Sequence, residues 1–263
     1  MKLGFSVAAL APWRGGRAAM RMGLVSLPPG EWRDERSDPA LRREALARPG
    51  QAIVLPEAEA AGAEAARMIG VEGGLVEAAA AGWEDLALVT RAGDAHVLSG
   101  AAIGFPTGWT LPEKIGLSIT EVHAPTQGYA DKLALGVERF FDTLPPGKVS
   151  GRANFFVVAS GDLAYLPEAP PEQLFADVTG ENAGERLWVR CERQTFVRLP
   201  ETGAILFGIG VYRARLDTLA APLVIDLATA VTKFMPGEDE RRGAPQYAQA
   251  LSNYAGQRGG NDA

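Results

Sequence analysis

Residues 187–212 read LWVRCERQTFVRLPETGAILFGIGVY, and this stretch decides the fold. Two apolar-rich runs flank residues 199–203, Leu-Pro-Glu-Thr-Gly, whose proline and glycine predict the turn of a β-hairpin. Side chains in the first arm alternate between two faces, as in a strand. One face carries aromatic, charged and amide groups: Trp188, Arg190, Glu192, Gln194, Phe196 and Arg198. A polar strand face of this kind either is exposed to water or lines a pocket. The second arm, 204–211, is nearly all apolar, which predicts that the hairpin has a buried end.

The rest of the chain reads as helices and antiparallel strands. Hydrophobic spacing predicts helices at 39–48, 57–69, 75–81, 129–144 and 219–234. Short strands are expected at 86–90 and 95–99, joined as a hairpin, and at 152–159, whereas residues 1–30 look irregular. This pattern predicts an α+β domain, an antiparallel sheet with helices on one side.

The composition changes after Glu238, where charged residues, glycine and glutamine dominate. A short frayed helix at 247–254 within a disordered tail, residues 241–263, is the expectation for such a segment. The sequence therefore predicts one domain over residues 1–240.

Charge and cysteine content exclude several classes of protein. The 263 residues carry a net charge of −6 and no basic stripe, which argues against nucleic-acid binding. Cys191 is the one cysteine, so no disulfide can form within the chain. No run approaches the roughly 18 apolar residues that a membrane span needs. The first 11 residues superficially resemble a signal peptide, but their apolar run is short and contains a single positive charge.

Several motifs, taken together and in order, resemble the haem-dependent oxidative N-demethylase family. The resemblance runs from about residue 10 to about residue 220. It includes two loop motifs, Phe105-Pro-Thr-Gly-Trp109 and Val122-His-Ala-Pro-x-x-Gly-Tyr129, and the hairpin segment 191–205. The sequence departs from the family pattern at three positions. Gln127 replaces a proline, and Gly208 and Gly210 stand where the family usually has threonine and arginine.

The resemblance implies a sheet similar to a PAS module with an N-terminal helical and hairpin addition. It also implies haem b (iron protoporphyrin IX) as cofactor and a cytoplasmic location. The implied reaction uses O2 to demethylate a small secondary or tertiary alkylamine, giving formaldehyde and the demethylated amine. Electrons would come from a separate flavin or iron–sulfur reductase, because the sequence has no dinucleotide fingerprint and too few cysteines for a cluster. A homo-oligomer is possible.

The chain has two histidines, which narrows the choice of an iron ligand. His96 lies in a predicted strand, where a partly exposed structural side chain is expected. His123 lies on a loop or at the end of an element, before Pro125. A loop histidine of this kind is usually structural or solvated, but the resemblance makes His123 the candidate proximal ligand, with its second nitrogen held by a partner. A thiolate ligand from Cys191 is the alternative, although a buried and inert thiol is the better interpretation.

Glu192 is the candidate carboxylate for the substrate. A dialkylammonium ion needs a carboxylate for its N–H groups and apolar walls for its methyls, which Trp188 and Phe196 on the same face offer. The alternative for Glu192 is a structural ion pair with Arg190 or Arg198.

Haem propionates would attract arginines, and hydrogen-bond donors would lie near the iron. The candidate arginines are Arg152, Arg190 and Arg198. Tyr129 and Asn154 are the candidate donors near the iron. Two other functions stay open because an arginine of the family pattern is missing at Gly210: a haem-binding sensor or carrier, and a haem-free interaction protein on the same scaffold.

Overall fold

The computed structural model describes residues 3–18 and 21–260. Contacts group these residues into two compact units, where the sequence predicted a single domain over 1–240. The first unit contains residues 22–152 and 193–210. The second contains residues 3–21, apart from 19 and 20, together with 153–192 and 211–260.

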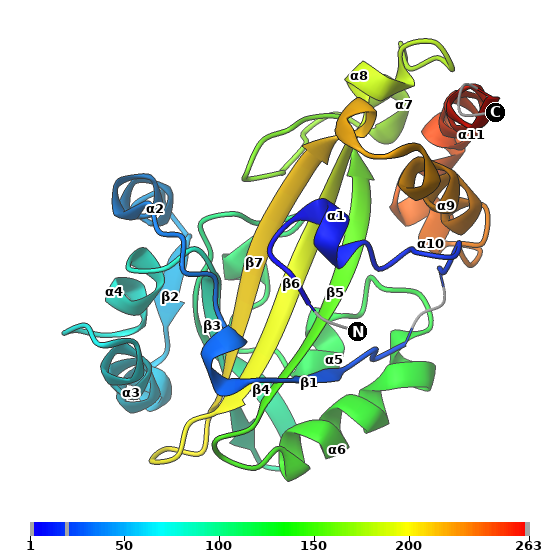
Figure 1. Cartoon of the computed structure of the whole chain (residues 1–263). Helices are drawn as coiled ribbons and strands as arrows, with labels where there is room; N and C mark the ends of the chain where they lie inside the picture. Colours follow the sequence, from blue (N-terminus) through cyan, green and yellow to red (C-terminus); the bar gives the residue numbers. More distant parts are fainter. Residues whose placement is uncertain (1–2, 19–20, 261–263) are drawn as a thin grey trace. The chain divides into compact units, whose positions relative to one another are not determined.

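The strands of the described residues form a seven-stranded sheet in the order β1-β5-β6-β7-β3-β4-β2 (Figure 1). Its registered pairs β1–β5, β2–β4, β3–β4 and β3–β7 are all antiparallel, so the predicted α+β class with an antiparallel sheet is confirmed. Strands β5, β6 and β7 each contain residues of both units. The strand bounds are β1 Val25–Leu27, β2 Ala52–Val54, β3 Asp85–Ala92, β4 Ala95–Ala102, β5 Val149–Val158, β6 Trp188–Arg198 and β7 Ile205–Arg215.

The hairpin predicted from residues 187–212 is confirmed as β6 and β7. Its turn closes through hydrogen bonds from Leu199 N to Ala204 O (2.9 Å) and from Gly203 N to Leu199 O (3.0 Å). Gly203 adopts a φ of 74°, a left-handed conformation that favours glycine. The polar face of β6 is not a solvated face, however. Both faces are mostly buried, since nearly every residue from 189 to 197 is shielded from water.

The helices of the first unit agree with the sequence pattern. Asp38 caps α2 by accepting a hydrogen bond from Leu41 N at 3.0 Å, with Pro39 in the first turn. A π-helical turn, Ala130–Ala134, leads into α6 and replaces the start of the continuous helix expected there. Short 3₁₀ turns occur at Pro29–Glu31, Pro56–Ala58 and Leu111–Glu113. The helix bounds are α2 Pro39–Leu46, α3 Glu59–Ile69, α4 Leu75–Ala80, α5 Ile119–Val122 and α6 Leu135–Thr143.

Two apolar layers stabilise the first unit. Alanine-rich α3 and α4 pack with Leu86, Leu88 and Leu206 in one buried cluster. Residues of β7 alternate in direction, so Phe207 points to the other face, where it stacks on Phe196 at 4.7 Å. Helix α6 contributes Phe140 and Phe141 to this second aromatic layer.

The second unit contains the remaining helices and the N-terminal segment. The Trp13 side chain is fully buried and its indole N–H donates to Leu223 O at 2.8 Å. Part of the segment expected to be irregular therefore belongs to the packed core. The bounds are α1 Val7–Leu10, α7 Pro171–Leu174, α8 Ala183–Arg186, a 3₁₀ turn Leu216–Thr218, α9 Ala221–Val231, α10 Glu238–Arg241 and α11 Ala244–Gly260.

The segment after residue 241 is a helix, so the predicted disordered tail is wrong for residues 244–260. Tyr247, Leu251 and Ala255 recur every four residues and are buried, which gives this polar segment one apolar face. Arg242 fixes the start of the segment by donating to Phe155 O at 2.5 Å and lying over the Phe156 ring at 4.8 Å. None of the helices in the described ranges is both long and apolar enough to cross a bilayer.

Candidate functional site

His123 ends the short helix α5 and is held from two sides. A capping box starts this helix: Ser118 N donates to Glu121 Oε2 at 2.9 Å, and Glu121 N donates to Ser118 Oγ at 3.3 Å. The imidazole Nδ1 lies 2.8 Å from Ile119 O, one turn earlier. Its ring stacks on Tyr129, with ring centroids 4.3 Å apart and planes 7° from parallel. The loop residue predicted from sequence is therefore fixed in orientation.

The hydrogen bond to Ile119 determines the tautomer of His123. A carbonyl oxygen can only accept, so Nδ1 carries the proton and the lone pair of the neutral ring lies on Nε2. An imidazole that ligates a metal through one nitrogen normally donates the other N–H to a carbonyl or carboxylate. His123 thus has the chemistry of an Nε2 ligand.

Tyr129 follows Gly128, whose φ of 75° allows the chain to turn back onto the imidazole. Burial of the phenol and then the charge of Glu138 raise the pKa of Tyr129 to about 12, against an opposing effect of Arg152. The hydroxyl is therefore protonated at neutral pH and can donate a hydrogen bond.

His96 is buried, so the expectation of a partly exposed strand residue is wrong. Only 3% of its surface is accessible, and Nδ1 lies 2.5 Å from Glu138 Oε2 on α6. The ring also meets the edge of Phe141 at 5.2 Å. A sequence signal existed, because His96 shares its strand face with Leu98, a core residue.

Glu192 and Asn154 are brought together in the second unit. Asn154 Nδ2 donates to Glu192 Oε2 at 3.0 Å, and the carboxylate is buried. The amide oxygen of Asn154 is also buried and has no hydrogen-bond donor within the described residues. Trp188 belongs to the same unit, where its indole lies so close to Gly161 that a β-carbon there would come within 2.8 Å of three ring atoms. Phe196 belongs to the other unit and takes part in its aromatic layer.

Two of the candidate arginines bind backbone carbonyls. Arg190 Nη1 donates to Leu163 O at 2.7 Å and to Asp162 O at 3.1 Å. Arg198 donates to Leu144 O at 2.6 Å, to Gly203 O at 2.6 Å, and to Phe141 O. These contacts give both side chains a structural role. Arg190 holds the backbone at residues 162–163, and Arg198 connects the hairpin turn to the end of α6. Contacts of Arg152, Arg190 and Arg198 with propionates stay predictions.

Cys191 is fully buried, as predicted. Burial, and then the nearby charge of Glu192, raise the pKa of its thiol well above the ordinary value. The side chain therefore remains a thiol at neutral pH, which disfavours a thiolate ligand.

Gly208, one of the departures from the family pattern, is required by its neighbour on β6. A β-carbon at position 208 would lie 2.7 Å from Thr195 Oγ1, and the Thr195 side chain is itself buried. A threonine at position 208 therefore does not fit in this chain as long as Thr195 keeps its place.

We expect Gly208→Ala to destabilise the protein by about 1–3 kcal/mol, because the new methyl overpacks the core. Urea unfolding measures the loss, and the double variant G208A/T195A should recover most of it. Gly256→Ala is the control, since nothing lies within 4 Å of a β-carbon at that helical position. Equal unfolding midpoints for G208A and the native chain would show that the strand moves freely to accept the methyl.

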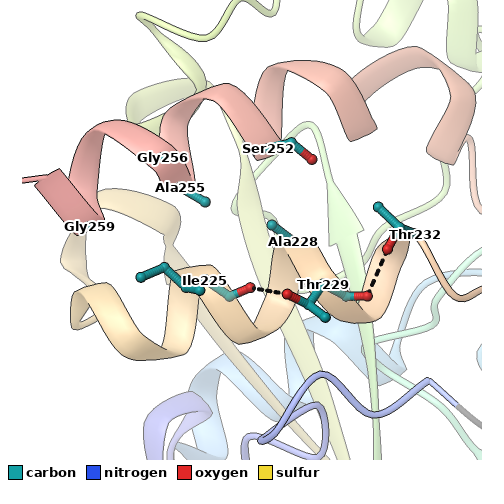
Figure 2. A pocket seen from close by; sticks show the side chains of 8 residues that line it. All are labelled: Ile225, Ala228, Thr229, Thr232, Ser252, Ala255, Gly256 and Gly259. Carbon is teal, nitrogen blue, oxygen red and sulfur yellow. Dashed lines mark hydrogen bonds between the residues drawn. The ribbon is translucent and has the colours of Figure 1, made fainter.

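Two of the surface hollows formed by the described residues belong to the second unit, and neither is lined by a predicted site residue. One, of about 590 Å³, is lined by residues 159–160, 162, 164–167, 173–174, 176–177 and 186. The other, of about 400 Å³, lies between α9 and α11 (Figure 2). Figure 2 shows its threonines bonded within their own helix, Thr229 Oγ1 to Ile225 O at 3.0 Å and Thr232 Oγ1 to Thr229 O at 2.9 Å. This groove therefore presents small and apolar groups and no imidazole.

The fold and these residues define an α+β protein with one oriented loop imidazole and, in its other unit, a buried carboxylate–amide pair. A family model described as haem-dependent oxidative N-demethylase, alpha subunit-like, matches residues 74–252. The chain belongs to this family, because the match covers more than half of its length. The match includes both loop motifs and the hairpin and ends about halfway along α11, beyond the end of the resemblance seen in the sequence.

The described residues fit a haem in one respect that geometry can test. One donor that haem iron accepts is a neutral imidazole nitrogen whose other ring nitrogen is fixed by a hydrogen bond, and His123 provides this arrangement. When bound, haem supplies the activation of O2.

Proposed function

We propose that this chain binds haem b through His123 Nε2 and catalyses oxidative N-demethylation of a small secondary or tertiary amine. The family match supports the reaction class. The observation that carries the ligand assignment is the bond from His123 Nδ1–H to Ile119 O, which leaves Nε2 as the basic nitrogen. Stacking on Tyr129 restricts rotation of the ring, so the imidazole is oriented before the cofactor arrives.

The carboxylate–amide pair supports an amine as the substrate. A secondary ammonium ion has two N–H donors, and Glu192 and Asn154 Oδ1 are two buried acceptors on neighbouring strands. An acceptor that lacks a donor costs about 1–3 kcal/mol when buried, so a donor from the ligand would relieve that cost. Trp188 would provide an apolar wall for the methyl groups, and Phe196 is the second candidate for that role.

The products in this proposal are formaldehyde and the demethylated amine. Electrons would come from a separate flavin or iron–sulfur reductase, since one cysteine cannot hold a cluster. A cytoplasmic location and a homo-oligomer belong to the same proposal.

A haem-binding sensor or carrier is the second candidate function. It is favoured by Gly210, which stands where the family pattern usually has arginine. Such a protein would share the iron ligand but would not release formaldehyde.

The decisive experiment is haem titration of the purified chain followed by absorbance and electron paramagnetic resonance. We expect a Soret band whose ligation signature disappears in His123→Ala and persists in Cys191→Ser, the control for thiolate ligation. Addition of dimethylamine should shift the spectrum, and a surrogate reductant with O2 should release formaldehyde. A Soret band without release supports the sensor or carrier, and no Soret band supports a haem-free interaction protein. An unchanged ligation signature in His123→Ala contradicts our ligand assignment.

A further inference from the structure

Both ends of the segment that carries His123 and Tyr129 are attached to the same short stretch of β4. At its start, Gly116 N donates to Leu98 O at 2.9 Å and Leu98 N donates to Leu117 O at 3.0 Å. The adjacent residue of β4, Val97, forms an isolated antiparallel bridge with Ser118, the cap of α5. One end of the segment is therefore fixed by backbone pairing.

A side-chain pair helps to fix the other end, beside the bonds from Arg198 to the end of α6 and the packing of Phe140 and Phe141. His96, the next residue along β4, holds Glu138 of α6 through Nδ1 and Oε2, 2.5 Å apart. The backbone N–H of His96 also faces both carboxylate oxygens at 3.3 Å. With the ring edge of Phe141 at 5.2 Å, these contacts seat α6 on the strand.

We propose that His96 and Glu138 form a clamp that positions His123 against Tyr129. A π-helical turn, Ala130–Ala134, connects Tyr129 directly to α6, so a displacement of α6 reaches Tyr129 within a few residues. Attachment of α6 to β4 through His96 and Glu138 reduces the number of conformations that Tyr129 can adopt. It therefore also restricts the imidazole of His123 that stacks on Tyr129.

His96 and Glu138 are therefore positioning residues, which act through Tyr129 on the imidazole. The consequence for haem rests on the proposed function, whereas the clamp itself does not. The side chain of Asp142 is a matched control, since it lies one turn further along α6, is half exposed, and pairs with Arg91 at 2.5 Å. Its carboxylate is 3.9 Å from His96 Nε2, beyond hydrogen-bond distance.

Imidazole NMR of the apo-protein tests the clamp directly. The chain has two histidines, so two sets of ring signals are expected, and His123→Ala and His96→Ala assign them. Stacking on Tyr129 should move the His123 ring protons upfield, and Tyr129→Leu should remove this displacement. We expect Glu138→Ala to lose the displacement, Glu138→Gln to retain part of it, and Asp142→Ala to keep it in full. If Glu138→Ala does not fold, a complete displacement in Glu138→Gln and in His96→Asn decides against the clamp.

Haem titration provides the second measurement. Glu138→Ala should weaken haem binding about tenfold, the lower end of the loss seen when a direct partner of a metal ligand is removed, because Glu138 acts only through Tyr129; Asp142→Ala should leave binding unchanged. An unaltered His123 signal in folded Glu138→Ala overturns the clamp. A native chain that binds no haem refutes the proposed function instead, because the NMR result stands independently of haem.

Discussion

Asp85→Ala should lower the free energy of unfolding by about 3–5 kcal/mol, because it leaves the fully buried Arg42 without its charge partner. Asp85 begins β3 and accepts from Arg42 Nη1 at 2.8 Å. It also accepts from Gly104 N at 2.7 Å and from Phe105 N at 3.0 Å. The substitution therefore leaves three hydrogen-bond donors without the carboxylate that accepts from them. Two of these donors are backbone N–H groups at the start of the Phe105–Trp109 loop, so the loop loses its bonds to β3.

Urea unfolding compares this variant with a break in an exposed ion pair. Arg48→Ala removes a partner that lies 3.6 Å from Glu44, and both of those side chains are largely exposed. Such a pair contributes less than about 1 kcal/mol. Asp85→Asn keeps an acceptor oxygen, so its loss in free energy of unfolding should lie between those of Asp85→Ala and Arg48→Ala. Equal losses for Asp85→Ala and Arg48→Ala would mean that water reaches Arg42 and replaces the carboxylate.

Local chemistry explains the elements that the sequence predicted well. The turn at 199–203 needs a left-handed residue and has Gly203, and Asp38 with Pro39 supplies a cap and a first turn. These signals act over a few residues, so they can be read without knowledge of the fold. The order of the strands cannot be read in this way, because β3 pairs with β7 across more than 100 residues.

The candidate site was predictable only where a motif marks it. His123 and Tyr129 belong to one motif, and the structure stacks them. Arg193 lies on the same β6 face as Cys191, is fully buried, and donates to Trp32 O at 3.2 Å and to Glu31 O. Burial of this charge is possible because carbonyl groups and a carboxylate from residues far away in the sequence lie around it. No local sequence pattern predicts such partners. The pairs His96–Glu138 and Arg42–Asp85 are of the same kind, since each joins residues about 40 positions apart.

Glu84 is the buried group with the most consequence for pH dependence. Its side chain is 3% exposed and accepts from Asp34 N at 2.7 Å. Desolvation raises the pKa of this carboxyl from its ordinary 4.5 to about 7; hydrogen bonds and Arg193 oppose the rise, while Asp34 adds to it. Between pH 4.5 and about 7, Glu84 therefore keeps its proton in the folded protein, whereas it has lost this proton in the unfolded chain.

We expect the protein to lose about 3 kcal/mol of stability through Glu84 as the pH rises from 4.5 to above 7, because a raised folded-state pKa stabilises only the protonated form. Glu84→Gln keeps an acceptor for Asp34 N but cannot ionise. Its stability relative to the native chain should thus increase by about that amount between pH 4.5 and pH 7.5 in urea unfolding. Glu44→Gln, at a 75% exposed side chain, controls for the loss of one negative charge and should show no such trend. A constant difference between Glu84→Gln and the native chain across this range would mean that Glu84 ionises as readily in the fold as in water, and that polar groups not yet identified solvate its carboxylate.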